Sequence, residues 1–188
     1  MGHLPLYEIE TAPDAAKPML EESVKAFGML PGLHKAMAGA PEVLEAYKVL
    51  HEKFQQTSFN NDEMTVVWQT INVEHGCHYC VPAHSGIAKM MGIDPAINEA
   101  LRNETPLADP KLEALRTFTL QMVRQRAVVS DEQVEAFFAA GFNSVHILEL
   151  ILGIAQKVMS NYINHVADTP VDDAFKGFLW TKTDVAAE

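Results

Sequence analysis

Residues 74–84 read Glu-His-Gly-Cys-His-Tyr-Cys-Val-Pro-Ala-His, and they contain both cysteines of the 188-residue chain. A proline is tolerated in the first turn of a helix but disrupts its interior. Pro82 therefore predicts a helix that begins between Tyr79 and Pro82 and runs to Gly92, with Cys77 and Cys80 at its N-terminal end. Unpaired backbone N–H groups and the helix dipole favour negative charge there. The stretch thus predicts a thiol that ionises readily.

The spacing of these residues predicts a thiol redox site. Residues three apart on a helical turn have Cβ atoms about 5 to 6 Å apart, and a modest adjustment reaches the roughly 3.8 Å of a disulfide. Cys77 and Cys80 can therefore bond to each other. His84 follows Cys80 by four positions, so it lies on the same helix face as a candidate proton acceptor or donor. Histidine suits this task because its ordinary pKa is about 6.5.

Two other readings of the same residues remain open. The cysteines are either buried apolar filler or, together with His84 and one of His75 and His78, ligands of a zinc ion. Structural zinc sites usually draw two ligand pairs from separate segments, and the chain has no second cysteine pair. We therefore expect neither a bound metal nor a bound cofactor.

The composition favours one globular domain spanning residues 1–188, with an extended N-terminal segment at 1–15 and a frayed tail at 181–188. The chain is 48% apolar and 21% charged, and its formal net charge is −11. That charge works against nucleic-acid binding. The sequence has no run of eighteen apolar residues and no signal-like start, so we expect a cytoplasmic protein without a membrane partner.

Helix start and stop signals recur along the chain, and strand-like alternation is nearly absent. We therefore predict an all-α domain of about seven to nine helices. Besides the helix after the cysteines, we expect a helix at 16–29 that is ended by a break at Pro31-Gly32. Further helices are expected at 41–54, at 64–71, from Pro95, from Pro110, from Ser130 to Gly141 and at 144–165, with a short one from Pro170.

The expected helix at 144–165 carries apolar residues around well over half its circumference. A helix of this kind is buried on most sides. We therefore expect it at the centre of the domain or against another subunit.

Residues 74–84 resemble the signature of the alkyl hydroperoxidase D-like, carboxymuconolactone decarboxylase-like superfamily, in its CxxCxxxH redox branch. Residues 161–172, Asn-Tyr-Ile-Asn-His-Val-Ala-Asp-Thr-Pro-Val-Asp, are similar to a motif of one uncharacterised branch. The resemblance covers most of residues 20–180. It implies an all-helical fold, association into dimers, trimers or hexamers, and a cysteine pair that reduces small hydroperoxides and is restored by an external thiol or lipoyl-type dithiol.

The same resemblance implies a proton relay in which the histidine is joined by a glutamate twelve residues before the first cysteine. Here that position is Thr65. Glu63 lies two positions before Thr65 and Glu74 three before Cys77, and either could orient His84. Tyr79 either donates a hydrogen bond to a sulfur or a bound peroxide, or packs as an aromatic lid.

Asn161 and His165 match the motif positions, but their spacing of four also suits ties between the last helix and its neighbours, so we leave them out of the catalytic set. We predict a thiol-dependent peroxidase in which Cys80 attacks and Cys77 resolves. One alternative is a redox sensor or oligomeric scaffold that is oxidised once. Another is a lyase of the carboxymuconolactone decarboxylase type, although that branch typically lacks the cysteine pair.

Overall fold

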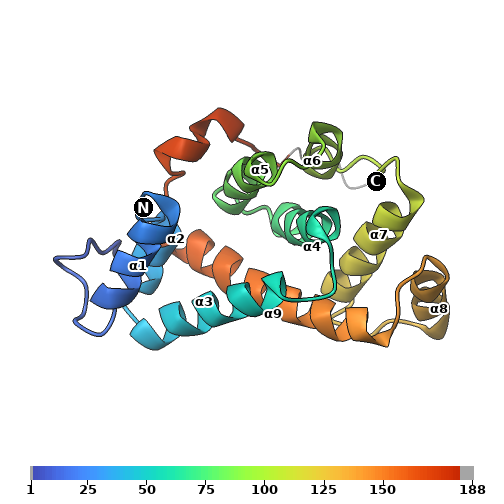
Figure 1. Cartoon of the computed structure of the whole chain (residues 1–188), viewed down its shortest axis with the longest axis horizontal. Coiled ribbons are helices and arrows are strands. Elements are labelled where there is room, and N and C mark those ends of the chain that lie inside the picture. Colours follow the sequence, from blue (N-terminus) through green and yellow to red (C-terminus); the bar gives the residue numbers. More distant parts are fainter. Residues whose placement is uncertain (1, 183–188) are drawn as a thin grey trace.

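The helix boundaries follow the capping residues of the sequence. The computed structural model describes residues 2–182 and contains, within that range, nine α-helices, one 3₁₀-helix and no strand (Figure 1). The helices are α1 (Lys17–Phe27), α2 (Gly32–Met37), α3 (Pro41–Gln55), α4 (Asn61–Glu74), α5 (Cys80–Met90), α6 (Pro95–Arg102), α7 (Pro110–Arg124), α8 (Asp131–Ala139), α9 (Ser144–Ala167) and the 3₁₀-helix η1 (Asp173–Phe178). The predicted all-α fold, with the cysteine pair at a helix N-terminus, is confirmed.

Side-chain caps explain where several helices begin. Asn60 and Glu63 form a capping box at α4, and Ser130 and Gln133 form one at α8. Such caps satisfy backbone N–H groups that have no partner inside the helix. Asp94 and Asp109 cap α6 and α7, each followed directly by a proline.

Two segments differ from the prediction. The break expected at Pro31-Gly32 is present, since α1 ends at Phe27, but Pro31 is also the N-cap of α2, a six-residue helix that was not predicted and that buries Leu33 and Met37. The helix expected from Pro170 is the 3₁₀-helix η1, which begins three residues later. Of the predicted frayed tail, residues 183–188 lie outside the described residues.

α4 occupies the middle of the fold, where it contacts α5, α6, α7 and α9 (Figure 1). Trp68 of α4 packs into a core that also contains Phe54 and the stacked rings of Phe118 and Phe137. A second core lies around α1, α2, α3 and the start of α5, and it contains Cys77 and Cys80. The cysteines are therefore built into a packed interior.

The burial of α9 inverts the expected pattern. The apolar side chains Leu148, Ile151 and Tyr162 are exposed, at 69%, 45% and 56%. The buried face of its second half is mostly polar and includes Gln156, Lys157, Ser160, Asn161 and Asn164, none more than 1% exposed. Within one chain α9 is therefore not buried on all its apolar sides, and burial of its exposed apolar residues against another subunit stays a prediction.

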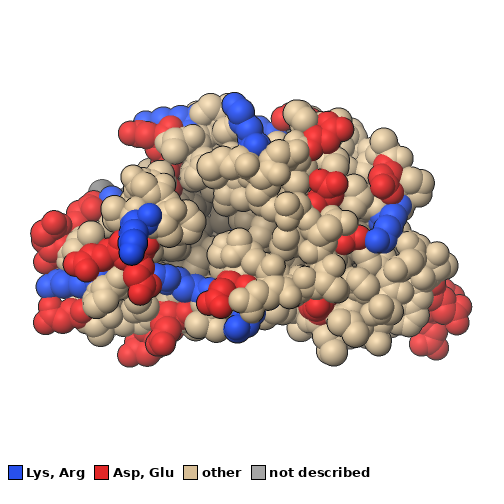
Figure 2. Space-filling model, viewed as in Figure 1, with Lys and Arg blue, Asp and Glu red and all other residues tan. Residues whose placement is uncertain are grey.

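Charged side chains are unevenly spread over the face shown in Figure 2. They gather at the end formed by α1 and α3 and again at the end formed by α8, and they leave much of the middle uncharged. None of the helices in residues 2–182 is by itself long and apolar enough to cross a membrane. Only α8 joined with α9, across a bend of 106°, reaches that length and composition.

Gly153 lets α9 approach α3. A Cβ atom at this position would lie 2.6 Å from the ring of the fully buried Phe54. Gly-to-Ala changes in helix interiors normally stabilise by about 1 kcal/mol, but here we expect overpacking to destabilise by about 1–3 kcal/mol in urea unfolding. Gly177→Ala, where nothing lies within 4 Å, is the control. A Gly153→Ala protein as stable as the wild type would contradict this close packing.

Candidate active site

The turn between α4 and α5 brings the two sulfurs together. Gly76 adopts a positive φ of 63°, which glycine tolerates without strain, and α5 begins at Cys80. Both cysteines are free, and the Cys77 Sγ–H donates to Cys80 Sγ over 2.6 Å. The Cys80 backbone N–H in turn donates to Cys77 Sγ at 3.2 Å. Cys77 and Cys80 are 0% and 2% exposed, so both sulfurs are inside the protein.

α9 places a lysine in the same interior. Lys157 is 1% exposed, and its Nζ lies 2.9 Å from Nε2 of His84. An ammonium group has donors only, so Nε2 accepts and the ring proton of neutral His84 is on Nδ1. No carboxylate within residues 2–182 forms an ion pair with Lys157. A buried ammonium needs a compensating negative charge.

The environment of the sulfurs separates their pKa values. Burial alone would raise the pKa of Cys80, but the hydrogen bond from Cys77, the charge of Lys157 and the amides of Asn161 and Asn164 outweigh it and lower this pKa to about 6. Burial, reinforced by the Cys80 sulfur, raises the pKa of Cys77 far above its ordinary value. At neutral pH Cys80 is therefore the thiolate and Cys77 the thiol.

The pKa values of Lys157 and His84 are both lowered. Burial lowers the pKa of Lys157, while the nearby Cys80 and Cys77 sulfurs oppose that shift. Burial and then the charge of Lys157 hold the pKa of His84 well below its usual range. His84 is consequently neutral, and the charge of Lys157 favours the Cys80 thiolate.

Amide side chains complete the surroundings of the sulfur. Asn164 Nδ2 donates to Cys80 Sγ at 3.2 Å. Asn161 Nδ2 donates to Asn72 Oδ1 at 2.9 Å, and its Oδ1 lies 2.9 Å from Nδ1 of His75. Asn161 is thus a tie between helices, as expected, but it also contributes to the lowered pKa of Cys80.

The structure does not bring the two predicted carboxylates to His84. Glu63 caps α4 and pairs with Lys111 at 2.7 Å. It precedes the end of α4 by eleven residues, a distance of roughly 16 Å along a helix. Glu74 is held by two hydrogen bonds from Arg124, of 2.8 and 2.7 Å. The partner of His84 is the cation Lys157, which sequence reasoning missed.

The remaining motif residues hold the site to the rest of the fold. His78 Nε2 lies 3.0 Å from the Thr169 carbonyl oxygen. With His75 at Asn161 and His84 at Lys157, the imidazoles of the proposed zinc set are turned to separate partners. Within residues 2–182, no group of three or more His, Cys, Asp or Glu side chains could hold a metal ion.

Tyr79 links the start of α5 to two other segments. Its hydroxyl donates to Asp172 Oδ2 at 2.6 Å and accepts from the Leu33 N–H at 3.2 Å. We expect Tyr79→Phe to cost about 1–3 kcal/mol of stability and to leave the Cys80 pKa unchanged, as measured by urea unfolding and thiolate titration. A stable Tyr79→Phe protein that no longer reacts with peroxide would instead support a contact between Tyr79 and the oxidant.

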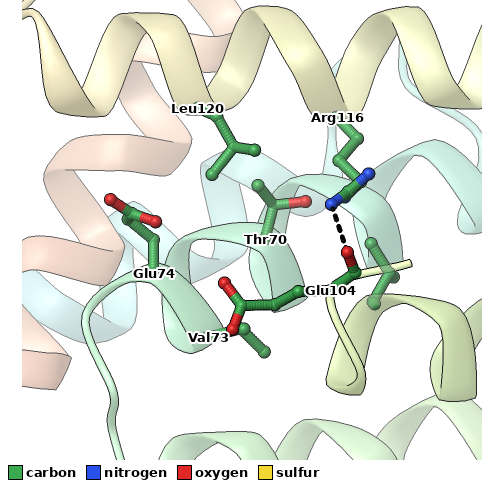
Figure 3. Close-up of a pocket in the computed structure, with 7 residues that line it drawn as sticks. Thr70, Val73, Glu74, Glu104, Arg116 and Leu120 are labelled. Carbon is green, nitrogen blue, oxygen red and sulfur yellow. Dashed lines mark hydrogen bonds between the residues drawn. The ribbon is translucent and has the colours of Figure 1, made fainter. Parts of the chain in front are cut away.

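A cavity elsewhere does not serve this chemistry. It has a volume of about 10 Å³ and lies between α4 and α7, where Arg116 donates to the Glu104 carbonyl oxygen at 3.2 Å (Figure 3). Such a volume holds about one water molecule. Of the predicted site residues only Glu74 lines it, so the site is defined by its side chains rather than by an open pocket.

No protein-family model matches the chain, and no curated protein sequence matches it. Its structure matches an uncharacterized peroxidase-related protein from Ralstonia eutropha JMP134, described as an alkylhydroperoxidase AhpD core, with a TM-score of 0.82 and 19% identity over 93% of this chain and 94% of that chain. The chain has the AhpD fold.

Two further structures with this AhpD-like fold carry different descriptions. A peroxidase-related protein from Silicibacter sp. TM1040 has a TM-score of 0.78 and 22% identity over 93% of each chain. A variant of the debrominase Bmp8 in complex with 2,3,4-tribromopyrrole has a TM-score of 0.76 and 15% identity over 94% of this chain and 95% of that one. The resemblance inferred from residues 74–84 is confirmed for the fold, and the redox branch stays a prediction.

Proposed function

We propose that this protein is a thiol-dependent peroxidase that reduces small hydroperoxides at Cys80. The observation that carries the proposal is the buried Cys80 sulfur, held 2.6 Å from Cys77 and balanced by Lys157. A thiolate, not a thiol, is the nucleophile toward peroxides. An ionised sulfur beside a protonated partner thiol is the arrangement that a two-cysteine peroxidase requires.

In the proposed reaction the Cys80 thiolate attacks the outer oxygen of a hydroperoxide, the O–O bond breaks and Cys80 becomes a sulfenic acid. Cys77 then condenses with it, forming the S–S bond and releasing water. The sulfurs, 2.6 Å apart, need to approach by only about half an ångström, since a disulfide measures about 2.05 Å. An external dithiol or a lipoyl-bearing protein restores both thiols.

The burial of the sulfurs supports a small oxidant. With Cys80 only 2% exposed, a reactant must displace covering side chains, and a small molecule displaces fewer. The Oδ1 of Asn164 has no hydrogen-bond partner within the described part of the chain. Because the Nδ2 of the same amide bonds to Cys80 Sγ, Oδ1 is an acceptor close to the sulfur for the O–H group of a hydroperoxide.

The same burial favours a second candidate, a sensor that is oxidised once. Peroxide consumption with an excess of a lipoyl-type dithiol separates the two, because an enzyme consumes many equivalents and a sensor consumes one. We expect sustained consumption and, in a separate peroxide pulse without dithiol, both thiols titratable before the pulse and neither after it. A single equivalent would contradict the peroxidase proposal.

Two further arms test other activities. Since Bmp8 is a debrominase with this fold, 2,3,4-tribromopyrrole is offered in place of peroxide. If the disulfide forms with 2,3,4-tribromopyrrole but not with peroxide, the proposed activity would be dehalogenation instead. If the protein's activity is unchanged after both cysteines are replaced with serine, the reaction does not use a thiol, and this result would support the alternative of a carboxymuconolactone decarboxylase-type lyase.

We also propose that a second copy of this chain binds the exposed apolar stripe of α9, formed by Val145, Leu148, Ile151, Tyr162 and Val166. The acidic and basic side chains along α9 are turned away from it, since Glu149 accepts from Ser58 and Lys157 contacts His84. We expect Leu148→Glu to shift an oligomer to monomer in light scattering. The control is Met90→Glu on α5, at 73% exposure. A monomeric wild type at high concentration would contradict the interface.

A further inference from the structure

Among the described residues, Lys157 is a buried charge whose compensation depends on the oxidation state of the cysteines. In the reduced protein the charge of the Cys80 sulfur favours the ammonium form of Lys157. Once the disulfide forms, that negative charge is gone. The ammonium, 1% exposed, would then keep its hydrogen bond to the neutral His84, and no ion pair with a described carboxylate would replace the lost charge. An unpaired buried ammonium is strongly disfavoured relative to the neutral amine.

The titratable groups on the neighbouring helices do not replace the lost charge. From α3, His51 and Tyr47 face the site. Burial, then the charge of Lys157, lowers the His51 pKa to about 4, and burial raises the Tyr47 pKa far above its ordinary value. Both are uncharged at neutral pH.

The other neighbouring elements give the same result. From α2, burial lowers the His34 pKa to about 4, and its Nδ1 lies 2.8 Å from Ser23 Oγ. The groups that α4 turns to this interior, Gln69 and Asn72, do not titrate. His75 contacts Asn161 rather than Lys157. Lys157 is therefore the group whose protonation must follow the sulfur.

We propose that Lys157 is the proton donor of this site, giving its ammonium proton to the oxygen that leaves when Cys80 is oxidised, so that the disulfide form contains a neutral lysine amine. The inference rests on the proposed thiol chemistry and adds to it the source of the proton. His84 holds Nζ in place by accepting from it at 2.9 Å.

The step balances without a proton from solvent. The Cys80 sulfur gives two electrons to the hydroperoxide, the S–O bond forms, the O–O bond breaks, and the leaving alkoxide takes the Lys157 proton to become an alcohol. Cys77 then forms the S–S bond, and its thiol hydrogen leaves with the sulfenic hydroxyl as water. Reduction by a dithiol returns two hydrogens, one to the Cys77 sulfur and one to Lys157.

The proton count of the thiol–disulfide couple tests this proposal without any peroxide. The potential of the full-length protein is measured against dithiol buffers between about pH 6.5 and 8, above the Cys80 pKa. If Lys157 loses its proton on oxidation, two protons leave with two electrons, and the equilibrium constant of the protein's own half-reaction changes a hundredfold per pH unit once the known pH dependence of the dithiol buffer is subtracted. That change corresponds to about 59 mV per unit.

The contrary outcome is a tenfold change, about 30 mV per pH unit, together with a Cys80 thiolate in the reduced protein. It would show that Lys157 keeps its proton and would overturn the proposal, whereas the peroxidase function would stand. Lys157→Arg is the matched control, since arginine keeps the cation but does not deprotonate. We expect the smaller slope in this variant, and equal slopes with an ionised Cys80 in both proteins would also overturn the proposal.

Discussion

Replacing Lys157 with methionine will raise the pKa of the Cys80 thiol from about 6 to at least the ordinary value of about 8.5. The variant removes the cation beside the sulfur and leaves the burial of the sulfur, which disfavours the thiolate. At pH 7 the ionised fraction then falls from roughly nine-tenths to below about one-twentieth. We expect oxidation by peroxide to slow at least about 20-fold, measured by stopped-flow across pH.

The dependence of the oxidation rate on pH shows whether the Cys80 pKa is raised in the variant. Cys80 is protonated and unreactive below its pKa, so the wild-type rate should rise through about pH 6 and then level. In Lys157→Met the rise should move above about pH 8.5. The control is Lys111→Met, which removes a lysine paired with Glu63 and should leave the profile in place. A profile unchanged in Lys157→Met would refute the role of this lysine.

Replacing Cys80 with serine will abolish oxidation by peroxide, whereas Cys77→Ser will still react and accumulate a sulfenic acid on Cys80. The reason is the raised pKa of Cys77, whose sulfur is buried and donates to Cys80. Mass spectrometry after a brief peroxide pulse, with a sulfenic-acid trap, detects the product in each variant. A trapped sulfenic acid only in Cys80→Ser would reverse the order of attack.

The local features of this site could be predicted because they depend on neighbours in sequence. Pro82 marks the start of α5, and the spacing of Cys77 and Cys80 brings the sulfurs together at that start. The capping box of Ser130 and Gln133 likewise marks the start of α8. Each of these features is decided within a few residues by the backbone groups that a helix end leaves unpaired.

The partner of His84 could not be predicted in the same way, because Lys157 lies 73 residues further along the chain. A single lysine in an apolar helix does not by itself indicate burial, since lysine is almost always exposed. The sequence feature that could have indicated a buried Lys157 is a set of polar residues at helical spacing on a largely apolar helix: Gln156, Lys157, Ser160, Asn161 and Asn164. This polar stripe faces the interior, and the apolar stripe faces outward.

The two predicted carboxylates show why the sign of the charge matters. Glu63 or Glu74 beside His84 would have made the histidine more basic, but both are held elsewhere by Lys111 and Arg124. With Lys157 in that position His84 stays neutral. A cation next to the cysteines stabilises the thiolate directly, so this site does not require a histidine that removes the thiol proton.

The central claim is that one sulfur is ionised at neutral pH inside the protein. A pH titration of the ultraviolet thiolate absorbance of the reduced, full-length chain tests it most directly. We predict one thiolate per chain with half-ionisation at about pH 6. The absence of thiolate absorbance until above about pH 8.5, the ordinary value for a cysteine, would contradict it.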